Sequence, residues 1–350
     1  MTAPASSRLP LYLAGSYTLL ALYGSLYSAT GWYLSGVDPL DFLEAGWPRY
    51  VTVFDLTFNT LAYIPLGFLW AASLMGRWPP AAACVSAALG SLALSLGVEA
   101  LQNYLPARVP SNLDLVCNAS GGLLGALAAL YWGRDLLDGG RLHAWRERRF
   151  RQGVMGDQGL MLMGLWLMTQ LNPETFLFGN GNLRGWLGLS PTIRFDASRF
   201  TELEMVTVAA QTLAVALIGS LLAANHPRLL PPVLIGVALA VKSLAQMLLM
   251  GSVQGFSWVT PGTLTGLLIG LLIWAFAMLL PQGGRQALAA LALMLAVALA
   301  NLMPDNPYLE NTLRVWQQGH FLNFNGLTRL ASTLWPFLAL PWLMLIRSDK

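Results

Sequence analysis

The stretch VEALQNYLPARVPSNLDLVCNASGGLLGALAAL, residues 98–130, decides the fold of this chain. It joins the ends of two long apolar runs through a short polar segment, which predicts two membrane helices linked by a tight loop. The polar side chains that gather at this boundary are Glu99, Gln102, Arg108, Asp114 and Asn118. An ionisable group near the hydrocarbon costs roughly 2–3 kcal/mol unless it is paired, hydrated or displaced toward the interface. The cluster is therefore a candidate binding site.

Composition places the whole chain among polytopic membrane proteins. Charged residues make up 11% of the 350 positions, against about 25% in an ordinary soluble domain, and 55% of the positions are apolar. Interfacial aromatic residues and Gly- or Pro-containing helices are common in membrane proteins, and the chain has 13 Trp, 34 Gly and 20 Pro. The net charge of +3 is small and indicates no nucleic-acid partner.

Apolar runs of about 20 residues predict an all-α fold with about ten transmembrane helices. They lie near residues 9–30, 54–76, 80–101, 113–133, 158–176, 204–224, 230–251, 262–280, 286–303 and 328–346. The predicted domains are a four-helix membrane module at 1–135, a basic cytoplasmic linker at 136–157 and a six-helix membrane module at 158–350.

The basic residues predict that both termini are cytoplasmic. With this orientation, twelve Lys and Arg lie on the cytoplasmic side and seven on the external side, although the external loops are longer. The segment GRDLLDGGRLHAWRERRFRQG, residues 133–153, is the strongest cytoplasmic anchor, because basic residues close to span ends stay inside. The bacterial inner membrane is the expected location.

With this orientation, the polar residues of the first four spans meet at the external face. Asp55 and Asn59 are four positions apart at the start of the second span and share a helix face. Asp114 and Asn118 repeat this spacing in the fourth span, which begins near Ser111, a suitable N-cap. The predicted ligand-binding residues are Asp55, Asn59, Glu99, Gln102, Arg108, Asp114 and Asn118.

Small residues are expected beneath the polar groups. Gly122 and Gly125 continue the helix face of Asp114 and Asn118, so that a neighbouring helix can approach closely there. The external segments between spans are rich in aromatic residues and are expected to form short interfacial helices above the site.

A purely structural network is the alternative to a binding site, and residue spacing alone does not separate the two. Arg108 would then pair with Glu99 or Asp114. One Arg among three carboxylates leaves acid in excess, whereas a structural network more often balances its charges. The excess favours a divalent metal, a shared proton, or a cationic or hydroxyl-rich ligand. Arg108 at the head-group level would also suit a lipid phosphate.

The pattern Glu99, Gln102, Arg108, Asp114, Asn118 and Gly121 resembles the core of the VanZ-like family. The segment NTLAYIPLGF, residues 59–68, matches a second family pattern through Asn59, Pro65 and Gly67. The resemblance covers roughly residues 10–135. It implies a small helical membrane module of the cell envelope, in which Pro65, Gly67, Gly121, Gly122 and Gly125 have structural roles. The family is named after an accessory protein of glycopeptide resistance that lowers susceptibility to teicoplanin, and it implies no established reaction.

The second half of the chain contains a weak internal repeat. KSLAQMLLMGSVQGFSWVTPGTLTGLLIGLL, residues 242–272, has the outline of residues 98–130, and TGLLIG at 265–270 compares with SGGLLG at 120–125. The carboxylate, Arg and Asn positions are missing, so the site is expected only in the first half. Lys242 is predicted near mid-membrane, deprotonated or paired with a carboxylate. Glu202 and Glu204 open a span from the outside and are expected to face water.

Three functions follow from these patterns. The first is a non-enzymatic protein that binds a lipid head group or a lipid-linked envelope precursor at the external face. The second is a transporter or flippase of an envelope lipid or small solute, suggested by the repeat and Lys242. The third is an intramembrane enzyme, which the sequence favours least because it has no H-E-x-x-H, G-x-S-x-G or P-loop pattern. No cofactor is predicted apart from the alternative of a divalent metal, and the sequence does not indicate an oligomeric state.

Overall fold

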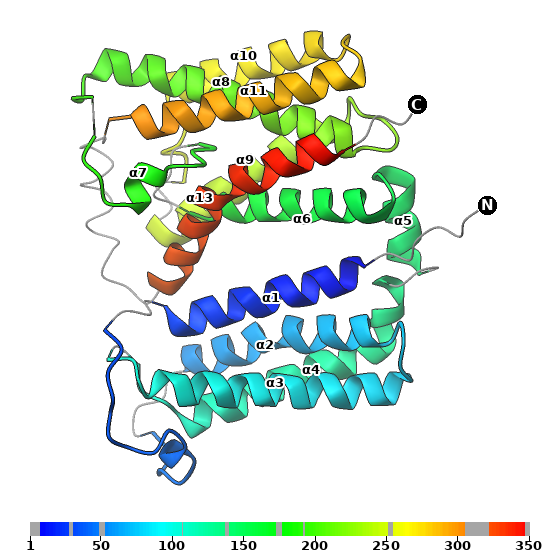
Figure 1. Ribbon diagram of the computed structural model, residues 1–350, viewed down its shortest axis with the longest axis vertical. Helices are drawn as coiled ribbons and strands as arrows, with labels where there is room; N and C mark the ends of the chain where they lie inside the picture. The colour runs from blue at the N-terminus through cyan, green and yellow to red at the C-terminus, as the bar shows by residue number, and fades with distance from the viewer. Residues whose placement is uncertain are drawn as a thin grey trace. The chain divides into compact units, whose positions relative to one another are not determined.

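The computed structural model describes residues 8–27, 31–48, 53–106, 108–136, 140–172, 177–191, 193–250, 255–304 and 322–346. These residues are mostly helical and contain no strand, only an isolated antiparallel bridge between Phe150 and Ala223. The chain divides into two units, Met1–Glu147 and Arg148–Lys350 (Figure 1). The division falls inside the basic segment that was predicted as the linker.

Unit 1 is built from four long helices. They are α1 (Leu9–Leu26), α2 (Val53–Leu74), α3 (Pro80–Gln102) and α4 (Asn112–Trp132). Shorter elements are the 3₁₀ turns η1 (Asp41–Leu43) and η2 (Gly133–Leu136), and the basic helix α5 (Arg141–Arg149) leads toward unit 2. The helix α4 begins at its N-cap Ser111, whose side chain accepts a hydrogen bond from the Asp114 backbone N–H.

Unit 2 surrounds one buried helix. Its elements are α6 (Gly153–Thr169), α7 (Leu183–Trp186), α8 (Ala197–Leu222), α9 (Leu230–Met250), α10 (Pro261–Ala277), α11 (Gln282–Leu302) and α13 (Leu322–Leu345). Every residue of α8 from 207 to 222 is buried, and α9, α10 and α11 pack against this helix. A helix that is apolar on all sides is stable only when neighbours cover it completely.

Each of the ten predicted spans coincides with a helix. Within the described residues, six helices are long and apolar enough to cross a bilayer: α1, α3, α4 together with η2, α8, α9 and α11. The protein is therefore an all-helical membrane protein, while ten crossings and cytoplasmic termini stay predictions. The span predicted at 158–176 ends early, because α6 stops at Thr169, shortly before the helix-breaking Pro173. The interfacial helices expected outside are reduced to η1 and α7 in the described parts of those segments.

In unit 1, α2 and α4 pack with their backbones in contact. A Cβ built on Gly121 would overlap the carbonyl oxygen of Thr60, and one on Gly125 would overlap that of Ile64. Across the same interface, a Cβ on Gly67 would overlap the carbonyl of Gly122. Close backbone approach through small residues is the usual way in which membrane helices gain van der Waals contact.

Unit 2 repeats this contact between α8 and α10. A Cβ on Gly266 would meet the carbonyl oxygen of Met205 at 2.6 Å, and one on Gly270 would meet that of Ala209 at the same distance. Gly266 lies 145 positions after Gly121, and Met205 lies 145 positions after Thr60. The pair Gly270 and Ala209 follows Gly125 and Ile64 by the same interval. The contact between these two helix pairs therefore has the same register at an interval of 145 positions.

Candidate functional site

A polar cluster occupies the end of unit 1 where α3 is joined to α4. We use this name for Asn59, Glu99, Gln102, Arg108 and Asp114. Glu99 lies in the last turn of α3 with 2% of its surface exposed, and its Oε2 accepts a hydrogen bond of 2.9 Å from the Ser111 backbone N–H. Because Ser111 caps α4, this bond ties the end of α3 to the start of the next helix.

Asn59 connects α2 to the same place. Its Nδ2 donates to Asp114 Oδ1 at 2.7 Å, and both side chains are half-buried. Asp114 lies in the first turn of α4, where the helix dipole favours a carboxylate. Asp55, one turn before Asn59, was also predicted for the site, but its side chain lies outside the described residues.

Gln102 and Arg108 hold the C-terminal end of α1. Gln102 Nε2 donates to the Ser25 carbonyl at 3.0 Å, and Arg108 Nη2 donates to the carbonyls of Gly24 and Tyr27 at 3.3 and 2.9 Å. The last carbonyls of a helix have no partner within the helix, so side-chain donors are suited to them. The predicted alternative, a salt bridge from Arg108 to Glu99 or Asp114, is not formed between these described residues.

Part of the Arg108 guanidinium makes no hydrogen bond to described residues. Only Nη2 bonds to described residues, and Nε and Nη1 make no hydrogen bond there. Burial lowers the pKa of Arg108, and the charge of Glu99 opposes that shift. The guanidinium stays charged at neutral pH because its ordinary pKa is far higher. The end of unit 1 where α3 is joined to α4 therefore contains a half-buried cation with N–H groups available to a ligand.

Asn118 lies deeper and belongs to a different contact. Its Nδ2 donates to Ser95 Oγ at 3.0 Å, and its Oδ1 is buried without a hydrogen-bond partner among the described residues. Asn118 is one helical turn below Asp114, about 6 Å along the axis. The structure thus places Asn118 below the polar cluster, beside the α2–α4 glycine contact.

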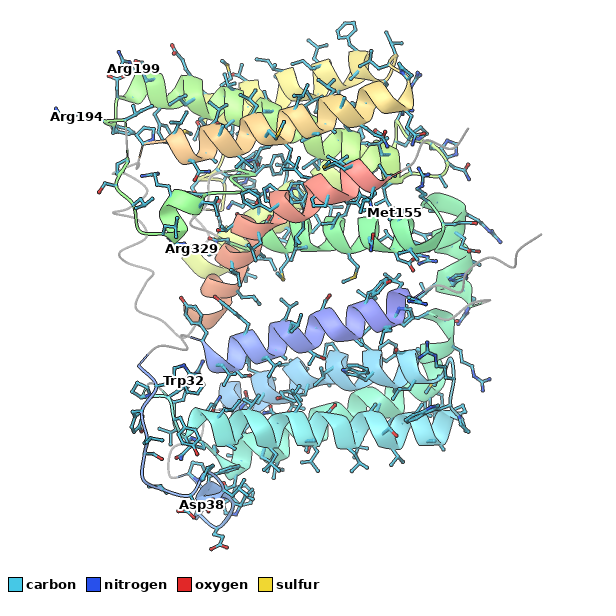
Figure 2. All side chains as sticks on the ribbon, in the orientation of Figure 1. Trp32, Asp38, Met155, Arg194, Arg199 and Arg329 are labelled. Atoms are coloured by element: carbon cyan, nitrogen blue, oxygen red, sulfur yellow. The ribbon has the colours of Figure 1, made fainter. Side chains whose placement is uncertain are left out.

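Residues 31–48 lie over the polar cluster. Asn103 Nδ2 donates to Ser35 Oγ at 2.7 Å, and Asn112 Nδ2 donates to the Ala45 carbonyl at 2.7 Å. Figure 2 labels Trp32 and Asp38 in this segment. Its exposed apolar side chains are Trp32, Tyr33, Leu34, Val37, Leu40, Leu43 and Trp47. An aromatic, apolar segment fastened to helix ends is typical of the membrane interface.

Across the ranges that the structure describes, no group of three or more His, Cys, Asp and Glu side chains gathers closely enough to hold an ion. Glu99 is also engaged by the Ser111 N–H, which reduces its availability as a ligand.

One buried carboxylate was missed by the sequence analysis. Glu204 of α8 was expected to face water, yet only 4% of its surface is exposed. Its Oε2 accepts a hydrogen bond of 2.6 Å from Thr260 Oγ1, the N-cap of α10. Glu204 lies 145 positions after Asn59, which likewise bonds to the start of its partner helix. The interval of 145 positions was the sequence signal that could have indicated the burial of Glu204. The first turns of α8 are otherwise polar and are typical of a solvated helix start.

Comparison with known proteins is consistent with the geometry of unit 1. Residues 17–133 match the model of the VanZ/LLP1 family. No curated protein and no solved structure gave a match to the chain. The match spans α1 to α4 and contains the whole polar cluster. The N-terminal part of this membrane protein is therefore a VanZ-like module.

Proposed function

We propose that the VanZ-like module binds the phosphate of a lipid head group, or of a lipid-linked envelope precursor, at the external face of the bacterial inner membrane. The observation that carries this proposal is the half-buried Arg108, whose Nε and Nη1 have no hydrogen bond within the described residues. Nε and Nη1 lie on different edges of the guanidinium, so either atom can donate a charge-assisted hydrogen bond to a phosphate oxygen. Binding alone accounts for the arrangement, and no catalytic step is invoked.

The neighbouring residues support this role. The α1 carbonyls keep Arg108 at the helix ends, and Asn59 with Asp114 offers polar groups for hydroxyls of a head group. The exposed apolar side chains of residues 31–48 would lie in the interfacial layer, which brings lipid phosphates to the height of Arg108. If the ligand is a lipid-linked precursor, the module would also alter susceptibility to glycopeptides such as teicoplanin.

Arg108→Ala is expected to lower lipid phosphate binding by at least about tenfold, because a charge-assisted hydrogen bond is lost. The measurement is native mass spectrometry of the purified full chain, titrated separately with phosphatidylglycerol and with a polyprenyl phosphate. A preference for one of the two distinguishes a phospholipid from a lipid-linked precursor. Equal binding by wild type and Arg108→Ala would refute the proposal.

A control variant separates ligand contact from loss of structure. Gln102→Leu removes another contact to the end of α1 without removing a phosphate donor, and should bind like wild type.

Val109→Cys tests the side of the membrane, since Val109 is highly exposed and the natural thiols Cys84 and Cys117 are buried. A membrane-impermeant thiol reagent should label this variant from outside intact cells. Labelling only after lysis would place the polar cluster in the cytoplasm.

A transporter or flippase is the second candidate, and the repeated helix contact favours it. We propose that α6, α8, α9 and α10 are a diverged second copy of α1 to α4, as the common interval of 145 positions suggests. Repeated modules with a central charge are a frequent basis of transporters, and Lys242 of α9 is fully buried.

Lys242→Met should abolish the movement of a fluorescent phospholipid across the bilayer of proteoliposomes if the protein has this activity. Unchanged movement would leave Lys242 with a structural role.

A further inference from the structure

Unit 2 contains irregular backbone inside its helix bundle. Residues 177–181 are not helical, yet all five are buried. The Gly181 N–H donates to the Ser332 carbonyl at 2.8 Å, and Asn301 Nδ2 donates to the Gly181 carbonyl at 2.8 Å. Phe178 and Gly181 have positive φ angles of 55° and 84°. Buried irregular backbone needs partners for its N–H and C=O groups, and side chains and carbonyls of the neighbouring helices supply some of them here.

Three buried polar groups around this loop have no hydrogen-bond partner in the described chain. They are Trp166 Nε1, Asn180 Nδ2 and Gln211 Oε1, on residues with 2% exposure or less. Two contacts place these three residues around the loop. The ring of Trp166 lies 5.2 Å from that of Phe178, and Gln211 Nε2 donates to the Asn180 carbonyl at 3.5 Å. Buried polar groups are almost always satisfied, so the loop region implies a partner that the described residues do not provide.

Lys242 brings an amine to the same region. It is fully buried, and its Nζ donates to the carbonyl of Asn172, just beyond the end of α6. Gln170 links this point back to Trp166, because its Nε2 donates to the Trp166 carbonyl at 3.2 Å. The Lys242 amine and the residue that carries the open indole N–H thus both contact the C-terminal end of α6.

The chemistry of these groups selects the ligand. An indole N–H only donates, and no rotation turns it into an acceptor, while a bound anion favours the charged, donating form of Lys242. Asn180 adds a second donor, and Gln211 keeps its own donor on the Asn180 carbonyl. We propose that unit 2 binds an oxyanion, a carboxylate or a phosphate, beside residues 177–181, with Trp166 Nε1, Asn180 Nδ2 and Lys242 Nζ as donors. This site is separate from the polar cluster of unit 1 and does not depend on Arg108.

The test measures the thermal unfolding midpoint of the purified full chain by circular dichroism. Sodium phosphate and sodium acetate are titrated separately against sodium chloride at equal ionic strength. At least one oxyanion should raise the midpoint with saturation, and the larger shift tells phosphate from carboxylate. If both oxyanions act only as chloride does, water alone fills the region and the proposal is overturned.

Two variants identify the donors. Trp166→Phe keeps an aromatic ring against Phe178 but removes the N–H, and should raise the half-saturating concentration about fivefold to tenfold. Lys242→Met should raise it more than about tenfold, since a charged donor is lost. If Lys242→Met does not fold, Trp166→Phe decides alone, and wild-type anion binding by that variant overturns the assignment. Arg108→Ala in unit 1 is the control and must keep the anion shift, because its loss would move the site to unit 1.

Discussion

Gly125→Leu is expected to prevent α2 and α4 of unit 1 from packing. The glycine lies against the backbone carbonyl of Ile64, so that even a Cβ has no space and the helices must separate. Backbone atoms cannot move aside as the end of a flexible side chain can, and the loss should reach at least about 3 kcal/mol, the upper range for overpacked cores. Unfolding of the purified protein in increasing sodium dodecyl sulfate, followed by circular dichroism, measures the effect.

Gly97→Leu on α3 is the matched control. A Cβ at Gly97 meets nothing within 4 Å, so the same substitution should change stability by less than about 1 kcal/mol. Gly270→Leu extends the test to unit 2, where the glycine lies against the carbonyl of Ala209. Stability losses of similar size in Gly125→Leu and Gly97→Leu would show that added bulk, and not the α2–α4 contact, is responsible.

Glu99→Leu is expected to release the loop between α3 and α4. The carboxylate is the acceptor for the Ser111 N–H, and leucine leaves that donor without its partner. An unsatisfied buried donor costs roughly 1–3 kcal/mol, and the loosened loop should also reduce lipid binding through Arg108. The free energy of unfolding and the lipid affinity are both measured, since the two effects need not be proportional.

Glu99→Gln separates the acceptor from the charge. Glutamine keeps a carbonyl oxygen at the same distance from the backbone, so it should retain the bond to Ser111 and lose less than about 1 kcal/mol. If the glutamine and leucine variants are equally unstable, the negative charge of Glu99 holds the loop, and the hydrogen bond is secondary.

Local signals in the chain determined where the helices are. Apolar runs of about 20 residues coincide with a helix at all ten predicted positions, because burial of apolar side chains and satisfaction of backbone groups both act within one segment. Ser111 could be predicted as the N-cap of α4 for a similar reason, since capping involves only the first turn. The glycine spacing in residues 121–125 indicated a close helix contact, and the pattern around Glu99 and Arg108 indicated the family.

Only the tertiary structure decided which groups meet. Arg108 bonds to carbonyls of α1, more than 80 positions earlier in the chain, and not to the carboxylates that lie nearest in sequence. Glu204 is buried because the N-cap of α10 packs against the first turns of α8. No local sequence pattern indicates that contact. Residues 177–181 belong to an external segment that was expected to form interfacial helices, but they are buried and bonded to α8, α11 and α13. Hydrophobicity and capping act over one or two helical turns, whereas the partner of a polar side chain depends on how distant helices pack.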